Sequence, residues 1–558
     1  MPVFCLGFHI GHDRGASLIK NGTIVAAIAE ERLDRVKHSK GEFLPLLSIK
    51  YVLKEASIEA NLLDLIVFTH SGCPINEQIL NVWTREISEA LDCQNVPIQM
   101  IGHHDAHAFA VYFTSPYKKA AIFIADGGGD IPIPEAIEAE SYYYASGQKI
   151  ELIYRRFQQT TVKYGTSLAV KRFDYMTPPN RSRQISLGFK YQQITDILGF
   201  GFGGAGKTMG LAPYGNQFIK LPSKITGLNI HLTYEDYIKE LFTIYQQSDL
   251  SYSQFIKKNR CNIAWDIQFF LSETVLSLAT NLRKATSSDY LCLAGGIFLN
   301  CVANRNINDF SGFHDTFILP PAGDDGQAIG AALYGYYKIL NANRKIYGHF
   351  NAYTGHRYSQ KSIRYAVERL GFMPIEYVSE NELCDEIVRR LTKGEIGAIL
   401  RGRSEIGPRA LGNRSIIASP SQKGMRDRIN SKVKFREDFR PFAPICTIEK
   451  AQNYFDIKRP SPYMLLVANV HPLWKKKLCE ITHVDGSARL QTVNQSDNSF
   501  IWRLLKRFGL QTGYEVLINT SFNIAGEPIV ETPADAVKCF ASTDIDFLVM
   551  ENLLILKE

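Results

Sequence analysis

Two histidines lie four positions apart in the stretch IGHHDAHA, at His103 and His107. In a helix this spacing places both imidazoles on one face, which is the arrangement of many metal sites. Two carboxylates extend the set, because Asp126 follows the apolar run AIFIA and Asp324 stands in the glycine-rich stretch PPAGDDGQAIG. Ends of strands and starts of helices are where α/β folds expose ligand-binding groups. The four residues therefore predict a metal site.

A shell of two imidazoles and two carboxylates favours Fe, Mn or Zn over Ca or Mg, and the sequence alone does not choose among the three. A histidine pair by itself is equally compatible with a structural role, so the prediction depends on the two carboxylates. Four neighbouring side chains rank lower, as alternatives or as partners of the ligands: His104, Asp105, Asp130 and Asp325.

Residues 201–208, GFGGAGKT, match the phosphate-binding pattern G-x-x-x-x-G-K-T letter by letter. Such a loop binds phosphate where a strand leads into it and a helix leaves it. The preceding KYQQITDILGF has apolar residues at helical spacing, and Pro213 and Gly215 after the motif do not continue a helix. The match is therefore interpreted as accidental, although Lys207 could contact an anion within another architecture.

The elements around these motifs follow from the hydrophobic pattern. The opening segment predicts three strands, the last two joined by the hairpin turn Asn21-Gly22. Further buried-type strands are predicted at 121–125 and 290–294. The stretch QAIGAALYGYYKIL after Gly326 has small residues at helical spacing, which predicts a helix packed closely against a neighbour.

Turn-forming residues at about 340–360 indicate a domain boundary. A second α/β unit is expected beyond it, with helices near 361–370 and 380–393 and a strand at 396–400. The chain of 558 residues is long enough for several cores, and 45% hydrophobic residues without repeats indicate a folded globular protein.

Three predicted strands end in glycine-rich polar turns: GFHIGHDRGAS, ADGGGD and AGGIFLN. Each alone is weak evidence, since glycine turns are common. Their order behind the N-terminal hairpin resembles the layout of actin, sugar-kinase and Hsp70-type ATPases, whose two ribonuclease-H-like halves bind ATP. The candidate residues for binding ATP or an adenylate are Asp126, Gly127, Gly128, Gly296 and Asn300.

Net charge is +7, from 63 basic and 56 acidic residues, and basic residues gather between 401 and 440. A solvated face and a pocket for small phosphates both fit this cluster. No nucleic-acid-binding module is recognisable, so no nucleic-acid partner is expected. The sequence contains no leader and no run of about 20 apolar residues, which predicts a cytoplasmic protein without a membrane partner. The ten cysteines form no C-x-x-C pair, so neither a zinc ribbon nor a disulfide framework is expected.

Ten ordered motifs carry a resemblance that covers nearly the entire chain: GHDRGASLIKNGTIVAAIAEERLDRVKH, HHDAHA, ADGGGD, GKTMGLAPYG, LAGGIFLN, GDDGQAIGAAL, EIGPRALGNRSI, VKFREDFRPFAP, HVDGSARLQTV and INTSFNIAGEPIV. The chain resembles the O-carbamoyltransferase family, which includes NodU-type nodulation enzymes and antibiotic carbamoyltransferases. GKTMGLAPYG belongs to the family's own pattern, which supports the view that the phosphate-loop match is accidental.

The resemblance implies an α/β chain of two domains. Residues 1–345 would form a metal- and ATP-binding domain of the actin/Hsp70 type, similar to the metal-dependent ATPases of tRNA threonylcarbamoylation. Residues 356–558 would form a YrdC-like domain that converts carbamoyl phosphate and ATP, supplied with Mg, into carbamoyl adenylate. The first domain would then transfer the carbamoyl group to a hydroxyl of a sugar or specialised metabolite. Alternatives left open are carbamoylation of an amine or of tRNA, and a nucleotide-binding regulator without turnover.

The resemblance also implies roles for single residues. Iron would be held by the four predicted ligands, and His12 and Lys37 fall on active-site positions of the first domain. Arg14 departs from the small residue usual there, which could alter the acceptor site. The second-domain site for carbamoyl phosphate and nucleotide would comprise Arg409, Lys434, Arg440, Arg489 and Ser521, with Lys434 and Arg440 as the catalytic candidates.

These basic residues suit the implied substrate, because arginine binds phosphate oxygens bidentately and lysine supplies a compact charge. His12 could accept the proton of the acceptor hydroxyl or only bind the acceptor. The sequence identifies neither the acceptor nor the oligomeric state, although its Tyr and Phe content would allow a homodimer. Variable loops at 178–184 and 216–233 are expected to determine which acceptor binds.

Overall fold

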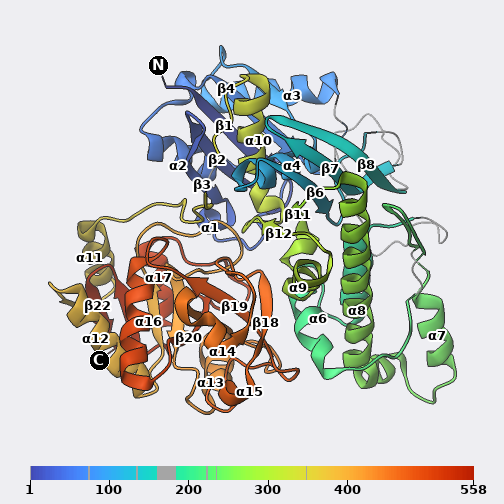
Figure 1. The fold of residues 1–558 in the computed structure, drawn as a ribbon. Coiled ribbons are helices and arrows are strands. Elements are labelled where there is room, and N and C mark those ends of the chain that lie inside the picture. The colour runs from blue at the N-terminus through green and yellow to red at the C-terminus, as the bar shows by residue number, and fades with distance from the viewer. Residues whose placement is uncertain are drawn as a thin grey trace. The chain divides into compact units, whose positions relative to one another are not determined.

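A computed structural model describes residues 2–72, 74, 76–132, 136–159, 184–221, 224–233, 235–346 and 348–557. The chain divides into two compact units, each with its own sheets (Figure 1). The first unit comprises Met1–Ala27 and Lys40–Phe350, and the second comprises Ile28–Ser39 and Asn351–Glu558. The segment Ile28–Ser39, expected in the first domain, thus belongs to the second unit.

The first sheet of the first unit has the order β3-β2-β1-β4-β5. Its strands are β1 (Phe4–Ile10), β2 (Gly15–Lys20), β3 (Thr23–Ala29), β4 (Leu65–His70) and β5 (Ile98–Met100). Asn21 and Gly22 both have positive φ, 50° and 76°, between β2 and β3. This is the backbone that a two-residue hairpin turn requires, so the predicted hairpin is confirmed. Strand β4 runs parallel to β1.

The second sheet of this unit has the order β12-β11-β6-β7-β8. Its strands are β6 (Lys119–Ala125), β7 (Ala136–Ser146), β8 (Lys149–Gln159), β11 (Tyr290–Ala294) and β12 (Asp315–Ile318). Strands β6 and β11 are the two buried strands predicted from sequence, and they run parallel. Their carboxyl ends therefore meet at one edge of the sheet, where Asp126 and Gly295 follow them.

Helices α4 (His103–Thr114) and α10 (Gln327–Tyr334) pack against each other in the first unit, and α10 also contacts β1. A Cβ atom on Gly330 would lie 1.9 Å from the Ala106 carbonyl oxygen, and one on Gly7 would lie 2.2 Å from that of Ala328. Only glycine allows this approach, so the close packing predicted for the helix after Gly326 is confirmed. The contact holds the helix bearing His103 and His107 against the element that follows Asp324.

The flanks of GFGGAGKT differ partly from expectation. Helix α5 (Leu187–Ile197) precedes the motif, which confirms that no strand leads into it, but α6 (Ala205–Leu211) begins inside the motif and passes Thr208. Pro213 is accommodated in a short 3₁₀ turn after α6. The remaining helices of the first unit are α2 (Leu46–Ala56), α3 (Glu77–Leu91), α7 (Ile238–Gln246), α8 (Tyr252–Thr286) and α9 (Cys301–Phe310).

The second unit contains a ten-stranded mixed sheet with the order β13-β22-β21-β14-β15-β20-β16-β19-β18-β17. Its strands are β13 (Pro374–Glu376), β14 (Gly397–Leu400), β15 (Arg414–Ala418), β16 (Ala443–Thr447), β17 (Phe455–Asp456), β18 (Leu466–Val470), β19 (Ser487–Val493), β20 (Val516–Ser521), β21 (Phe547–Met550) and β22 (Leu553–Leu556). Its helices are α1 (Glu31–Asp34), α11 (Gln360–Arg369), α12 (Glu380–Thr392), α13 (Met425–Ile429), α14 (Ala451–Tyr454), α15 (Pro472–Lys475), α16 (Ser499–Thr512) and α17 (Pro533–Ala541). Helices α11 and α12 and strand β14 match the three predicted elements.

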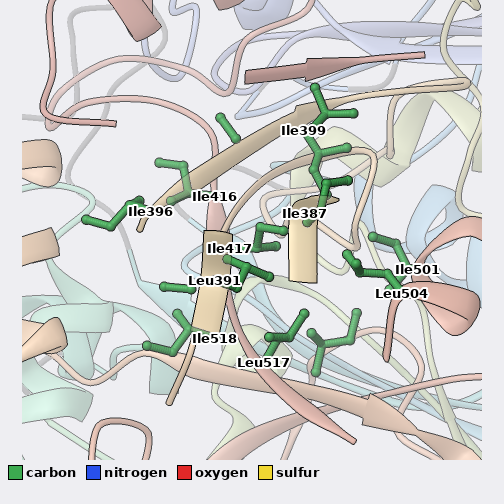
Figure 2. Packing of buried hydrophobic residues seen from close by; sticks show 14 of the residues in the cluster. Ile387, Leu391, Ile396, Ile399, Ile416, Ile417, Ile501, Leu504, Leu517 and Ile518 are labelled. Carbon is green, nitrogen blue, oxygen red and sulfur yellow. The ribbon is translucent and has the colours of Figure 1, made fainter. Parts of the chain in front are cut away.

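Both faces of this sheet are buried at its centre, in β15. Ile416 and Ile417 are consecutive in β15, so they point to opposite faces, yet both are at most 1% exposed. Figure 2 shows them among Ile387 and Leu391 of α12 and the neighbouring core residues. The α/β class predicted from sequence is thus confirmed in both units. Within the described residues, no helix has the length and apolar character needed to span a membrane.

Candidate functional site

The four predicted metal ligands come together in the first unit. His103, His107, Asp126 and Asp324 each offer one ligand atom, and these atoms all lie within 4.8 Å of one another. His107 Nε2 is 3.2 Å from Asp126 Oδ2, and both Nε2 atoms are 3.4 Å from Asp324 Oδ1. Ligands bound at about 2.1 Å to one ion are roughly 3.0–3.4 Å apart in octahedral or tetrahedral shells. The spacing therefore fits a single cation.

Each ligand is positioned by a different feature of the fold. His103 and His107 lie one turn apart in α4 and are fully buried. Asp126 follows β6, where Gly296 leaves it room, since a Cβ there would lie 3.1 Å from Asp126 Oδ1. Asp324 begins the 3₁₀ turn that leads into α10. The helical spacing of the two histidines and the positions of the two aspartates at the ends of elements thus produce one cluster.

The electrostatics of the four groups also fit a cation. Burial raises the pKa of Asp126 and of Asp324, and repulsion from Asp324 adds to the effect on Asp126, but the imidazoles outweigh these effects and hold both values below the usual range. Burial lowers the pKa of His103 and His107, whereas the carboxylates outweigh it and raise both. Among the described residues, His103 Nε2 has no hydrogen-bond partner. A divalent cation would displace protons from the imidazoles and bind this nitrogen, which lies 3.4 Å from Asp324 Oδ1.

His12 lies beside this cluster. Its Nε2 lies 3.3 Å from Asp324 Oδ2, and its Nδ1 lies 3.1 Å from Asp13 Oδ2. Burial lowers the pKa of His12, but the Asp324 and Asp13 carboxylates outweigh it and raise the value to about 9. The side chain is 39% exposed, so one side of it is open to solvent.

Two further residues at this cluster, Ser71 and His9, were not predicted from the sequence. Ser71 Oγ lies 3.2 Å from both His9 Nε2 and His103 Nδ1 and 3.3 Å from Asp324 Oδ2. His9 Nε2 is also 3.6 Å from Asp324 Oδ2. Two signals in the sequence could have indicated them. His9 is a polar residue in the otherwise apolar strand FCLGFHI, and Ser71 comes directly after β4, the parallel neighbour of β1.

Of the candidate nucleotide residues of the first unit, Gly127 and Gly296 contact or adjoin the Asp126 carboxylate. The Gly127 amide donates to Asp126 Oδ1 at 2.6 Å, and a Cβ on Gly128 would lie 2.8 Å from Gln158 Nε2. Asn300 serves the fold, because its Oδ1 accepts from the Ala303 amide at the start of α9 and its Nδ2 donates to Gln268. Nucleotide binding by these residues stays a prediction.

A second cluster lies in the second unit and is built around Lys434. Its Nζ is 2.7 Å from the Ser521 carbonyl oxygen, 3.2 Å from Ser521 Oγ and 2.6 Å from Asn523 Oδ1. Burial, with repulsion from Arg436, Arg440 and Lys37, lowers the pKa of Lys434 well below its usual value. The predicted residues Lys434, Arg440 and Ser521 therefore share one region.

Arg436 and Arg489 extend this cationic cluster. Burial, with repulsion from Arg440 and Arg489, lowers the pKa of Arg436 to about 9. Burial also lowers the pKa of Arg440; repulsion from Arg489 lowers it further, and attraction to Glu437 partly raises it. An anion bound among these cations would offset both the burial cost and the repulsion. Arg436 was not predicted from the sequence, although it stands between the two predicted residues in KFREDFR.

Lys37 lies in the second unit, and this corrects its expected place in the first domain. Its segment is held by two arginines. Arg32 Nη2 donates to the carbonyl oxygens of Glu405 and Gly407 at 3.3 and 2.9 Å, and Arg35 Nη1 donates to that of Ile529 at 2.7 Å. These contacts explain why a segment close in sequence to β1 and β2 belongs to the other unit.

Arg409 lies half-buried in the loop that Arg32 holds. Glu405 Oε1 organises this loop by accepting from the backbone amides of Leu411 and Asn413, both at 2.7 Å, and of Arg414 at 3.3 Å. The loop presenting Arg409 is thus fixed from inside by Glu405 and from the N-terminal segment by Arg32.

Two protein-family models match this chain. The model described as "Carbamoyltransferase N-terminus" matches residues 5–91 and 75–333, and "Carbamoyltransferase C-terminus" matches residues 388–557. The chain belongs to the carbamoyltransferase family. It is an enzyme, and the resemblance found in the sequence is confirmed.

Relatives of this carbamoyltransferase include enzymes named for O-carbamoylation. The chain is 32% identical to nodulation protein NolNO of Sinorhizobium fredii, over 98% of the chain and 79% of that protein. It is 32% identical to 3'-hydroxymethylcephem-O-carbamoyltransferase of Amycolatopsis lactamdurans, over 62% of the chain and 64% of that protein. Among solved structures, HypF of T. kodakarensis has a TM-score of 0.41 at 15% identity, covering 61% of the chain and 49% of HypF. A TM-score this low establishes no shared fold.

Arg14, for which the resemblance implied an effect on the acceptor site, contacts Phe43. Its guanidinium lies over the Phe43 ring, 4.0 Å from the centroid, and donates to the Phe43 carbonyl oxygen at 3.1 Å. Of the two predicted acceptor loops, residues 178–183, 222 and 223 lie outside the described residues. The second loop otherwise contains the strand pair β9 (Lys224–Thr226) and β10 (Asn229–His231).

Proposed function

We propose that this carbamoyltransferase makes carbamoyl adenylate in its second unit and transfers the carbamoyl group to a hydroxyl in its first. The observation that carries the proposal is the cationic cluster of Lys434, Arg436, Arg440 and Arg489. Carbamoyl phosphate is a small dianion, and such a cluster suits it. The relative named for a hydroxymethyl cephem supports a hydroxyl acceptor, which we infer is a sugar or a specialised metabolite.

The first reaction consumes two phosphate compounds. Water cleaves carbamoyl phosphate into carbamate and phosphate, and a carbamate oxygen then attacks the α-phosphorus of ATP while pyrophosphate leaves. Catalysis of such steps is mainly positioning and neutralisation of charge, with Mg bound to ATP. Lys434 and Arg440 would neutralise the transferring groups. Arg409, Arg489 and Ser521 would orient the substrates.

The second reaction would take place at the histidine and aspartate cluster. A divalent cation, with Fe favoured over Mn or Zn, would supply positive charge there for the adenylate when held by His103, His107, Asp126 and Asp324. The acceptor oxygen attacks the carbamoyl carbon, AMP leaves, and His12 accepts the hydroxyl proton at Nε2 or Nδ1. The carboxylate of Asp324 raises the pKa of His12, so a cation that neutralises this carboxylate would favour the basic form.

The proposal is tested by pyrophosphate release without an acceptor. The full chain is mixed with ATP and Mg, with and without carbamoyl phosphate, and pyrophosphate and phosphate are both measured. We expect pyrophosphate only when carbamoyl phosphate is present, accompanied by an equal amount of phosphate from its cleavage. Phosphate from ATP alone would indicate an ordinary ATPase, and no turnover under any condition would indicate a regulator; either result would contradict the proposal.

Arg32 provides a prediction within the second unit. Arg32→Ala removes the donor to the Glu405 and Gly407 carbonyl oxygens and frees the loop that presents Arg409. A misplacement of about 1 Å can cost about 100-fold in rate, so we expect pyrophosphate formation to fall by about that factor. Metal binding by the first unit should not change. A matched control is Arg85→Ala, on α3 of the first unit; a loss of pyrophosphate formation as large in this variant would contradict the assigned role of Arg32.

A further inference from the structure

Two carboxylates bind the start of the helix that carries the histidine ligands. Asp130 Oδ2 accepts from the His103 backbone amide, and Glu138 Oε2 lies 3.4 Å from that of His104. Both carboxylates are at most 1% exposed. The first amides of a helix lack partners within the helix and carry partial positive charge, so buried carboxylates there stabilise α4 in one position.

Glu138 also holds the loop that carries Asp126. Its Oε2 accepts from the Asp130 amide at 3.1 Å. Its backbone pairs with the same loop, since Gly129 N donates to Glu138 O at 3.0 Å and Glu138 N donates to Asp130 O at 2.9 Å. One residue of β7 therefore connects the Asp126 loop with the first turn of α4.

Gly129 shows that this arrangement is tight. A Cβ on Gly129 would lie 2.4 Å from Glu138 Oε2 and 2.9 Å from His104 Cδ2. Any side chain at this position would displace the carboxylate from the helix start. The backbone between the Asp126 loop and α4 thus leaves space for the Glu138 carboxylate and little else.

Arg155 of β8 fixes the other oxygen of Glu138. Its Nη1 forms an ion pair with Glu138 Oε1, its Nη2 donates to Asp105 Oδ1 at 2.8 Å, and its Nε donates to Ser141 Oγ at 2.9 Å. Ser141 Oγ in turn lies 2.7 Å from His104 Nδ1. A buried carboxylate is costly unless it is paired, and Arg155 both pairs it and links it to two residues of α4.

We propose that Glu138, held by Arg155, is a positioning residue for the metal site. It fixes the loop bearing Asp126 relative to the helix bearing His103 and His107, and it is not itself one of the four ligands. The inference rests on the metal site of the proposed function. Because the ligand atoms must stay within a few tenths of an ångström of their places, loss of this connection should weaken metal binding.

The test compares Mn²⁺ affinity among full-length variants by calorimetry. Glu138→Gln should bind Mn²⁺ about 10- to 100-fold more weakly than wild type, the range observed for groups that support metal ligands. Arg155→Met, which leaves the carboxylate but removes its partner, should shift affinity in the same direction. Glu151→Gln, an exposed glutamate on the same strand as Arg155, should bind as tightly as wild type.

Pyrophosphate formation by the second unit is the control, because a general loss of structure would reduce it. Weaker Mn²⁺ binding with unchanged pyrophosphate formation supports the positioning role. Unchanged Mn²⁺ affinity in both Glu138→Gln and Arg155→Met would overturn the positioning role. A loss of Mn²⁺ binding together with a loss of pyrophosphate formation and a lower unfolding temperature would also overturn it. If Glu138→Gln does not fold, the Arg155→Met affinity decides. A wild-type chain that binds no Mn²⁺, Fe²⁺ or Zn²⁺ would overturn the metal site itself, which distinguishes the two failures.

Discussion

Replacing Lys434 with methionine should reduce pyrophosphate formation from ATP and carbamoyl phosphate by a factor of about 10² to 10³. Removal of one well-placed donor to developing negative charge costs rates of this size. Lys434 is 3% exposed, it is surrounded by cations that lower its pKa, and it contacts Ser521 and Asn523. Binding of a dianion would raise the pKa of Lys434 and so favour its charged form.

Lys432 provides the matched control for this prediction. It lies in the same turn of chain, Asn430–Lys434, but its side chain is exposed. Lys432→Met should therefore keep pyrophosphate formation within about twofold, the usual range for surface substitutions. Mn²⁺ binding should be unchanged in both variants. Pyrophosphate formation at the wild-type rate by Lys434→Met would contradict the assignment of the cationic cluster to the adenylation step.

Local patterns predicted the parts of the fold that local chemistry determines. The Asn21-Gly22 turn requires two positive φ angles, which Asn and Gly adopt readily. The small residues of α10 predicted a close helix contact, and Gly330 shows it at the Ala106 carbonyl. The spacing of His103 and His107 placed both on one face of α4, so two features of the fold and one of the site were present in short stretches of sequence.

Contacts between distant segments were not predictable in this way. His9 and Ser71 meet only because β1 and β4 pair in parallel with His9 opposite Thr69, a register that neither strand encodes alone. Glu138 was not predicted because its role depends on contacts to Asp130 and His104, which lie on two other segments of the chain. Arg436 was not predicted because a run of charged residues does not indicate which of its side chains are buried.

The place of Lys37 shows the limit of assuming that neighbours in sequence share a domain. The chain enters the second unit at Ile28 and leaves it after Ser39. What holds this short segment there is a set of arginine contacts to backbone carbonyls near residues 405–407 and 528–529. Carbonyl partners carry no sequence signature, since every residue has one.

Replacing Asp324 with asparagine should have the largest effect in the first unit. Its Oδ1 lies 3.4 Å from the Nε2 atoms of both His103 and His107, and its Oδ2 faces His9, His12 and Ser71. Asparagine keeps the shape but removes the negative charge on which the raised pKa values of the imidazoles depend. Loss of a direct ligand should exceed the 10- to 100-fold cost of losing a supporting group, so we expect Mn²⁺ affinity to fall by at least about 100-fold.

Transfer of the carbamoyl group to any acceptor should be lost in Asp324→Asn, while pyrophosphate formation without acceptor should continue at the wild-type rate. The proposed function assigns the two reactions to different units, so the variant should release pyrophosphate without carbamoylated product. Asp325→Asn is the matched control, because Asp325 is adjacent and half-buried but outside the four-residue cluster. If Asp325→Asn lost as much Mn²⁺ affinity as Asp324→Asn, the ligand assignment would be contradicted. If Asp324→Asn lost pyrophosphate formation as well as carbamoyl transfer, the division of the two reactions between the units would be contradicted. Calorimetry and product analysis of the same preparations separate these outcomes.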